Sequence, residues 1–165
     1  MSVHVLVCFG RWQEIIDTPL PDDPELYLVS TAMHYAKGIA HASLKRFDAA
    51  DRERKLFHDS LRRIPPERKV FNNSAQSILA VGEKMLDGEL ECHKGNHEVG
   101  YARLREAVDR DDNLEYIEPW AWMHPPRACA CSSAGRTGPL RRGGGGLSRR
   151  FGLERSNSTV CAAPG

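Results

Sequence analysis

The chain has 165 residues, about the length of one domain, and a formal net charge of only +1. The apolar run Val3–Phe9 is too short to span a membrane and has no basic flank before it, so neither a membrane anchor nor a secretory signal is predicted. Five cysteines without a framework spacing favour a reducing compartment, and we expect a cytoplasmic protein.

The N-terminal part of the chain is predicted to be antiparallel helices with no strand. Residues 1–17 contain the end of one helix, a Gly-basic-aromatic turn and the start of the next helix. Three prolines within residues 18–24 mark a linker. Apolar residues spaced three and four apart then predict a helix pair over residues 25–64, with the second helix starting at about Asp48 and a Pro-Pro pair ending it.

A second helix pair is predicted over residues 73–110. Asn73 is a candidate helix cap, with Gln76 at the spacing of a capping box. One long helix follows, and a Gly-Asn pair ends it before the partner helix at 97–109. A further unit begins within residues 118–127.

Small residues recur at fixed offsets in the two helix pairs. Each pair has a small residue, a turn aromatic or histidine, and a second small residue: Gly38, Phe47 and Ala50, then Gly88, His97 and Gly100. Small residues at such offsets let paired helices approach closely, and we expect Gly38 and Ala50 to face each other. The offsets resemble tetratricopeptide repeats, although the two units lie 50 residues apart instead of about 34.

Three segments also look like a group of bacterial and fungal tetratricopeptide proteins of unassigned function. They are His-Tyr-Ala-Lys-Gly at 34–38, Met-Leu-Asp-Gly-Glu-Leu at 85–90 and Glu-Pro-Trp-Ala-Trp-Met at 118–123. The resemblance implies an all-α fold, in which antiparallel helix pairs stack as a short α-solenoid with a concave surface. It implies a scaffold without an assigned activity, and longer members of the group look His-rich along the groove.

We therefore expect a protein or peptide partner, or a small ligand, in the concave groove. The groove candidates are His34, Tyr35, His41, Met85, Glu89, His93, Glu118, Trp120, Trp122 and His124. The two tryptophans and the neighbouring Met123 can supply large contact area to a partner, or they can only pack the final helix. Self-association is also expected, because the first unit lacks a full helix and the last lacks a partner.

The sequence predicts no catalytic group, no metal site and no cofactor. His34 and His41 lie two helical turns, about 10 Å, apart and cannot share one zinc ion, whose ligands lie at about 2 Å. His93 and His97 are separated by a helix break, and the acidic residues near Glu89 are typical of a solvated surface. The alternative is a fragment of a His-rich repeat protein, with a metal-dependent or enzymatic site completed by repeats missing here.

Residues 128–165 differ in composition from the rest of the chain. Residues 1–127 carry 17 Lys and Arg against 21 Asp and Glu, whereas residues 128–165 carry six basic residues and one acidic residue. No helix or strand period is visible, and we expect a disordered tail. The Cys-Ala-Cys and Gly-rich stretches lack the spacing of zinc or phosphate sites, and without interleaved aromatics the arginines predict no specific nucleic-acid binding.

We also predict that the tail is read out of frame from about codon 128. Shifting each codon by one base permits a peptide with an apolar first helix, a Gly-Arg-Tyr turn and a Glu-Ala start of a second helix. Such a peptide resembles the repeat that should follow residues 118–127. The nucleotide sequence around codon 128 tests this prediction.

Overall fold

The computed structural model describes residues 3–23, 26–116, 122 and 126, which form six helices and one short strand ladder. The elements are α1 (Val3–Cys8), α2 (Trp12–Asp17), α3 (Tyr27–Ser43), α4 (Phe47–Arg62), β1 (Lys69–Val70), β2 (Asn73–Ser74), α5 (Ala75–Lys94) and α6 (His97–Asp112). The predicted helix start at 118–127, apart from Trp122 and Pro126, and the predicted tail at 128–165 lie outside the described residues.

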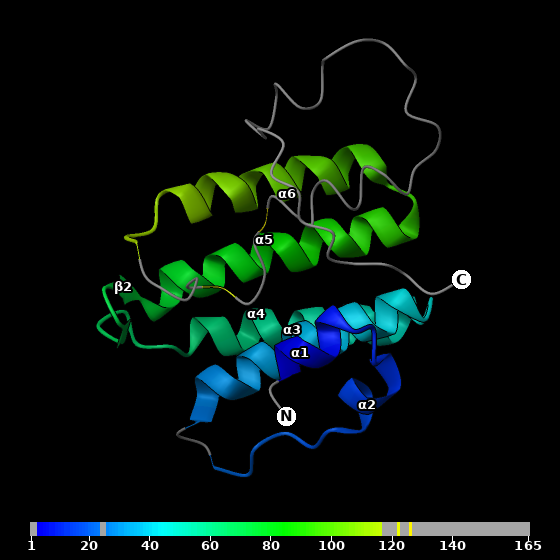
Figure 1. Ribbon diagram of the computed structural model, residues 1–165, viewed down its shortest axis with the longest axis horizontal. Helices are drawn as coiled ribbons and strands as arrows, with labels where there is room; N and C mark the ends of the chain where they lie inside the picture. The colour runs from blue at the N-terminus through cyan, green and yellow to red at the C-terminus, as the bar shows by residue number, and fades with distance from the viewer. Residues whose placement is uncertain (1–2, 24–25, 117–121, 123–125, 127–165) are drawn as a thin grey trace.

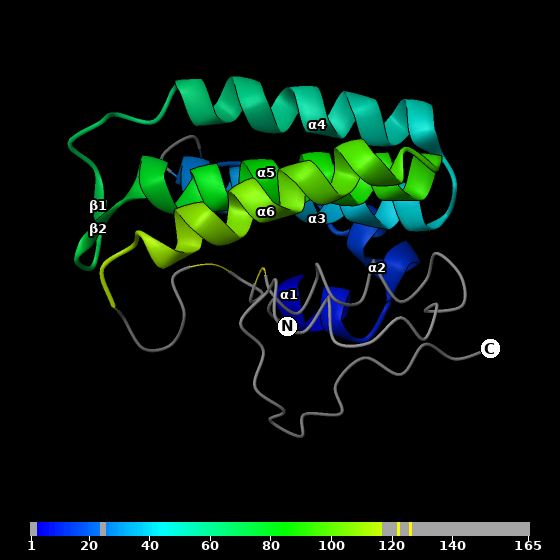
Figure 2. The same cartoon turned by 90° about the horizontal axis from the view of Figure 1, so that it is seen from above.

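The predicted all-α class is confirmed, and the helices pack as consecutive antiparallel pairs. Helices α1 and α2, α3 and α4, and α5 and α6 contact each other within their pairs, while α5 also packs against α3 and α4. Figure 1 shows the pairs following one another across the molecule, from α1 and α2 to α6. Seen from above, α4 lies on the side of the molecule opposite to α1 (Figure 2). None of the helices in the described part of the chain combines the length and the apolar character that crossing a membrane requires.

Two glycines allow the closest helix approach, between α5 and α6. A β-carbon built on Gly88 would lie 2.7 Å from Cγ of Leu104 and 2.9 Å from the carbonyl oxygen of Gly100. A β-carbon on Gly100 would in turn lie 2.9 Å from the carbonyl oxygen of Gly88. Since real β-carbons do not come this close to backbone atoms, both positions need glycine for the helices to pack as they do.

Gly38 gives room to two neighbouring helices. The groups nearest to a β-carbon at this position are Leu86 Cδ1 of α5, at 2.9 Å, and Glu53 Cβ of α4, at 3.7 Å. Ala50 is fully buried, but it is not among these nearest groups. The close contact at Gly38 therefore involves the second helix pair as well as α4.

The prediction that no strand is present is wrong for the connection between α4 and α5. Lys69 pairs with Ser74 and Val70 pairs with Asn73 in a two-residue antiparallel ladder. Phe71, at the turn between the strands, has a left-handed backbone with φ 55° and is 77% exposed. The ladder satisfies backbone groups where the chain must reverse direction before α5 begins.

The cap of α5 also differs from the prediction. The side chain of Ser74, not that of Asn73, accepts the hydrogen bond from the backbone N–H of Ser77 at 3.0 Å. The buried Asn73 amide donates to the carbonyl of Glu115 and accepts from its N–H, both at 2.8 Å. Gln76 donates to the carbonyl of Ile64 at 2.7 Å. Asn73 therefore fastens the start of α5 to the chain beyond α6, because a buried amide needs partners for both its groups.

The apolar core lies where the second and third helix pairs meet. Its largest fully buried side chains include Tyr35 and Phe57 from the α3–α4 pair and Met85, Leu86 and Leu104 from the α5–α6 pair. A smaller cluster fastens the first pair to α3, and it consists of Leu6, Ile15, Ala36 and Ala40. The two alanines let α1 and α2 lie close to α3.

Candidate functional site

An aromatic ring lies across helices α3 and α5. Trp122 is 5% exposed, and its ring meets the ring of Tyr35 edge-on, with centroids 5.0 Å apart and planes at 89°. On α5, a β-carbon built on Gly82 would overlap the indole, with Cε2 only 2.9 Å away and two further ring carbons closer. We call Tyr35 and Gly82, which hold this ring, the ring site.

The ring site is rigid on the side of Tyr35. Tyr35 is 2% exposed, and its ring also packs against Phe57 of α4, with centroids 6.4 Å apart and planes at 57°. Phe57 is fully buried. Because Tyr35 is held from behind by a core residue, it presents a fixed surface to the ring in front of it.

The indole N–H of Trp122 has no hydrogen-bond partner among the described residues, although the Nε1 atom is buried. A buried donor without an acceptor costs about 1–3 kcal/mol, because it gives up its hydrogen bonds to water. The ring site therefore matches the shape of the indole and leaves its one polar group unpaired.

The groove candidates of the sequence divide between core and surface. Tyr35, Met85 and Trp122 belong to one core cluster, so Trp122 covers two of the residues predicted to meet a partner. Glu89 is buried on α5, and His93 near the end of the same helix is partly exposed. Three further candidates lie outside the described residues, namely Glu118, Trp120 and His124.

Gly82 was not singled out by the sequence analysis. A glycine in the middle of a helix costs about 1 kcal/mol relative to alanine, and this cost is a signal that something packs closely on the backbone. Gly82 lies well inside the predicted long helix, so that signal was present. It did not show which side chain makes the contact, because Trp122 lies beyond α6 in the sequence.

His34 and His41 lie on either side of Gly38 on α3, with a carboxylate from α4 close to both. His34 Nδ1 and Glu53 Oε2 share a hydrogen bond of 2.7 Å. Burial lowers the pKa of His41 below its ordinary value; Glu53 opposes this shift, and three nearby cations, Arg46, Arg52 and Lys37, add to it. The buried Nδ1 of His41 has no hydrogen-bond partner among the described residues.

Helices α4, α5 and α6 are joined by ion pairs on another face. Arg54 lies 3.2 Å from Asp51, 3.4 Å from Glu91 and 3.8 Å from Asp87. Exposed pairs contribute at most about 1 kcal/mol each, but a network that includes half-buried groups fixes how the helices sit against each other.

The same face carries a histidine between two carboxylates. His58 places Nδ1 at 3.2 Å from Glu83 and Nε2 at 3.4 Å from Asp87. Its two nitrogens thus meet different carboxylates on opposite sides of the ring, so the three groups do not converge on one ion. Within the described part of the chain, no group of three His, Cys, Asp or Glu side chains is placed to hold a metal ion.

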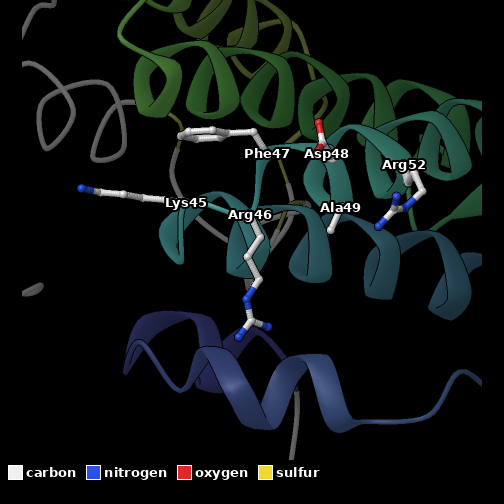
Figure 3. A pocket seen from close by; sticks show the side chains of 6 residues that line it. All are labelled: Lys45, Arg46, Phe47, Asp48, Ala49 and Arg52. Carbon is white, nitrogen blue, oxygen red and sulfur yellow. The ribbon is translucent and has the colours of Figure 1, made fainter.

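A shallow depression lies at the turn between α3 and α4. It is lined by Lys45, Arg46, Phe47, Asp48, Ala49 and Arg52. Figure 3 shows that Lys45 and Arg46 point in different directions, with Arg46 directed towards the first helix pair. The cations do not converge on one point, so the depression does not form a specific anion site. At the equivalent turn before α6, His97 stacks on Tyr101 with ring centroids 6.2 Å apart.

No known protein family, curated protein or solved structure matches the chain. Among the surfaces described above, the ring site is the one that combines a fixed shape with an incompletely satisfied occupant. Its groups offer contact area and shape, which is the chemistry of binding.

Proposed function

We propose that the protein is a tetratricopeptide-like scaffold that binds a segment of a partner protein along the face formed by α3 and α5. The helix pairs supply a rigid frame, in which consecutive α-hairpins place α3 beside α5. The observation that carries the proposal is the ring of Trp122, which lies against Tyr35 and Gly82 on that face although Trp122 belongs to neither helix.

The energetic argument rests on the size of an aromatic anchor. An aromatic side chain buries about 150–250 Å², which corresponds to about 4–6 kcal/mol of gross stabilisation at 25 cal/mol per Å². Interfaces draw most of their affinity from a few such anchors in well-packed positions. One ring in this site would therefore supply a large share of the free energy that a micromolar complex needs, about 8 kcal/mol.

A displayed library of random peptides tests the proposal. The full chain is immobilised, captured peptides are synthesised, and their affinity is measured by fluorescence anisotropy. We expect peptides with an aromatic residue to bind, and Gly82→Leu to abolish binding because its side chain fills the place of the ring.

Gly95→Leu is the matched control, since Gly95 lies at the far end of the same helix and has nothing within 4 Å of a β-carbon. Circular dichroism of both variants shows whether the fold is kept. Capture of no peptide, or of peptides that bind the folded Gly82→Leu variant as well as the parent chain, would refute the proposal.

A further inference from the structure

The ring site selects a flat group by its shape. Gly82 exposes its backbone to the ring, so an occupant must lie closer to α5 than any neighbouring β-carbon would allow. Tyr35 meets the ring edge-on, which is a favoured geometry for two aromatic rings. A branched aliphatic side chain is too thick to make both contacts, whereas an aromatic ring makes both.

The chemistry of the ring site disfavours the ring that fills it now. The site places no acceptor at the buried Nε1 of Trp122. A ring with a similar outline but no N–H donor makes the same apolar contacts and leaves no donor unpaired. From the usual cost of an unpaired donor, such a ring should bind about fivefold to a hundredfold more tightly than indole.

We propose that the ring site is an exchangeable binding site for aromatic rings that lack an N–H donor, and that Trp122 fills it within the chain. The occupant supplied by a partner is then a phenylalanine side chain, which displaces Trp122 when the partner segment binds. That occupant rests on the proposed function, whereas the ring preference rests on the geometry of Tyr35, Gly82 and Trp122 alone.

The test uses the full chain with Trp122→Ala, which empties the ring site. Indole and benzothiophene are titrated separately by calorimetry, because benzothiophene has the bicyclic outline of indole with sulfur in place of the N–H group. Both should bind, and benzothiophene should bind about fivefold to a hundredfold more tightly. Adding Gly82→Leu to the same variant should abolish binding of both.

Failure of either ring to bind a folded Trp122→Ala chain would overturn the proposal. Equal affinities for the two rings would overturn the preference for a ring without a donor.

A second measurement needs no cavity and so does not depend on the folding of that variant. Benzothiophene is added to the unaltered chain while tryptophan emission is recorded, with Trp122→Phe as the control. Displacement of Trp122 into water should shift the emission to longer wavelength in the parent chain, with a smaller shift in the control. An unchanged emission at saturating benzothiophene would contradict exchange.

The two proposals can fail separately. If rings bind but no displayed peptide does, the ring site stands and the proposed peptide-binding function falls. If peptides bind independently of Gly82 while neither ring binds, the scaffold function is retained at another surface and the ring site falls.

Discussion

Gly100→Ala is the sharpest test of how the α5–α6 pair is built. A β-carbon at Gly100 would meet the Gly88 carbonyl oxygen at 2.9 Å, the Cys92 nitrogen at 3.0 Å and the Cys92 sulfur at 2.5 Å. Two of these atoms belong to the backbone of α5, so they cannot rotate away and the helices must separate. Overpacking of this kind costs about 1–3 kcal/mol, and alanine regains about 1 kcal/mol in helix propensity. We expect a net loss of about 1–2 kcal/mol, because rigid contacts favour the upper half of the overpacking range.

Gly38→Ala is the matched control for that experiment. Its nearest neighbour would be Leu86 Cδ1 at 2.9 Å, the far end of a side chain that can change rotamer. The helix-propensity gain should therefore dominate, leaving stability unchanged or raised by up to about 1 kcal/mol. Urea unfolding followed by circular dichroism compares the two variants. If Gly100→Ala raises the unfolding midpoint as much as Gly38→Ala does, the close backbone contact between α5 and α6 is refuted.

Four further outcomes follow from the structure. Gly95→Ala should lose about 1 kcal/mol, since φ of 92° at the end of α5 is strained for any residue with a β-carbon, and Gly95→Asn should lose less in the same urea assay. Asn73→Ala should cost about 1–3 kcal/mol in that assay because it leaves both backbone groups of Glu115 without their partner, and a loss below about 0.5 kcal/mol would count against the clamp. Arg54→Met should destabilise the fold most at low salt, where the three carboxylates around it repel each other, and equal losses at low and high salt would contradict this reading. Burial lowers the pKa of His41, so its stabilising contribution is complete above its ordinary value of 6.5 and is lost as pH falls through 6.5 towards the lowered value; His41→Gln should flatten the decline of melting temperature in that range.

The helices could be predicted because their signals are local. Apolar spacing gave the pairs α3–α4 and α5–α6, and the Gly-Asn pair gave the end of α5, where Gly95 takes the left-handed conformation. The role of Asn73 could not be predicted in this way. Local cap chemistry depends on residues three positions away, whereas the partner of Asn73 is Glu115, 42 residues along the chain. The same holds for the short ladder before α5, which has too few residues for an alternating pattern.

The candidate site was predicted in part. Trp122 and Tyr35 were chosen for their residue types, and the structure brings their rings together. The spacing of His34 and His41 placed them two turns apart, and Glu53 lies with both of them. That carboxylate was not foreseen, because it comes from the facing helix and a helix pattern does not fix which residues meet across a pair.

The two polar and apolar faces of α5 differ in what a partner would gain there. On the face shared with α4 and α6, Arg54 and His58 already have carboxylate neighbours, so a partner must replace existing ion pairs and pay for their desolvation. On the face shared with α3, an incoming ring replaces Trp122, whose N–H is buried without an acceptor. The incoming ring recovers the apolar contacts, and the displaced indole recovers its hydrogen bond to water. Exchange there is favoured by both changes, which is why partner binding is assigned to the α3–α5 face.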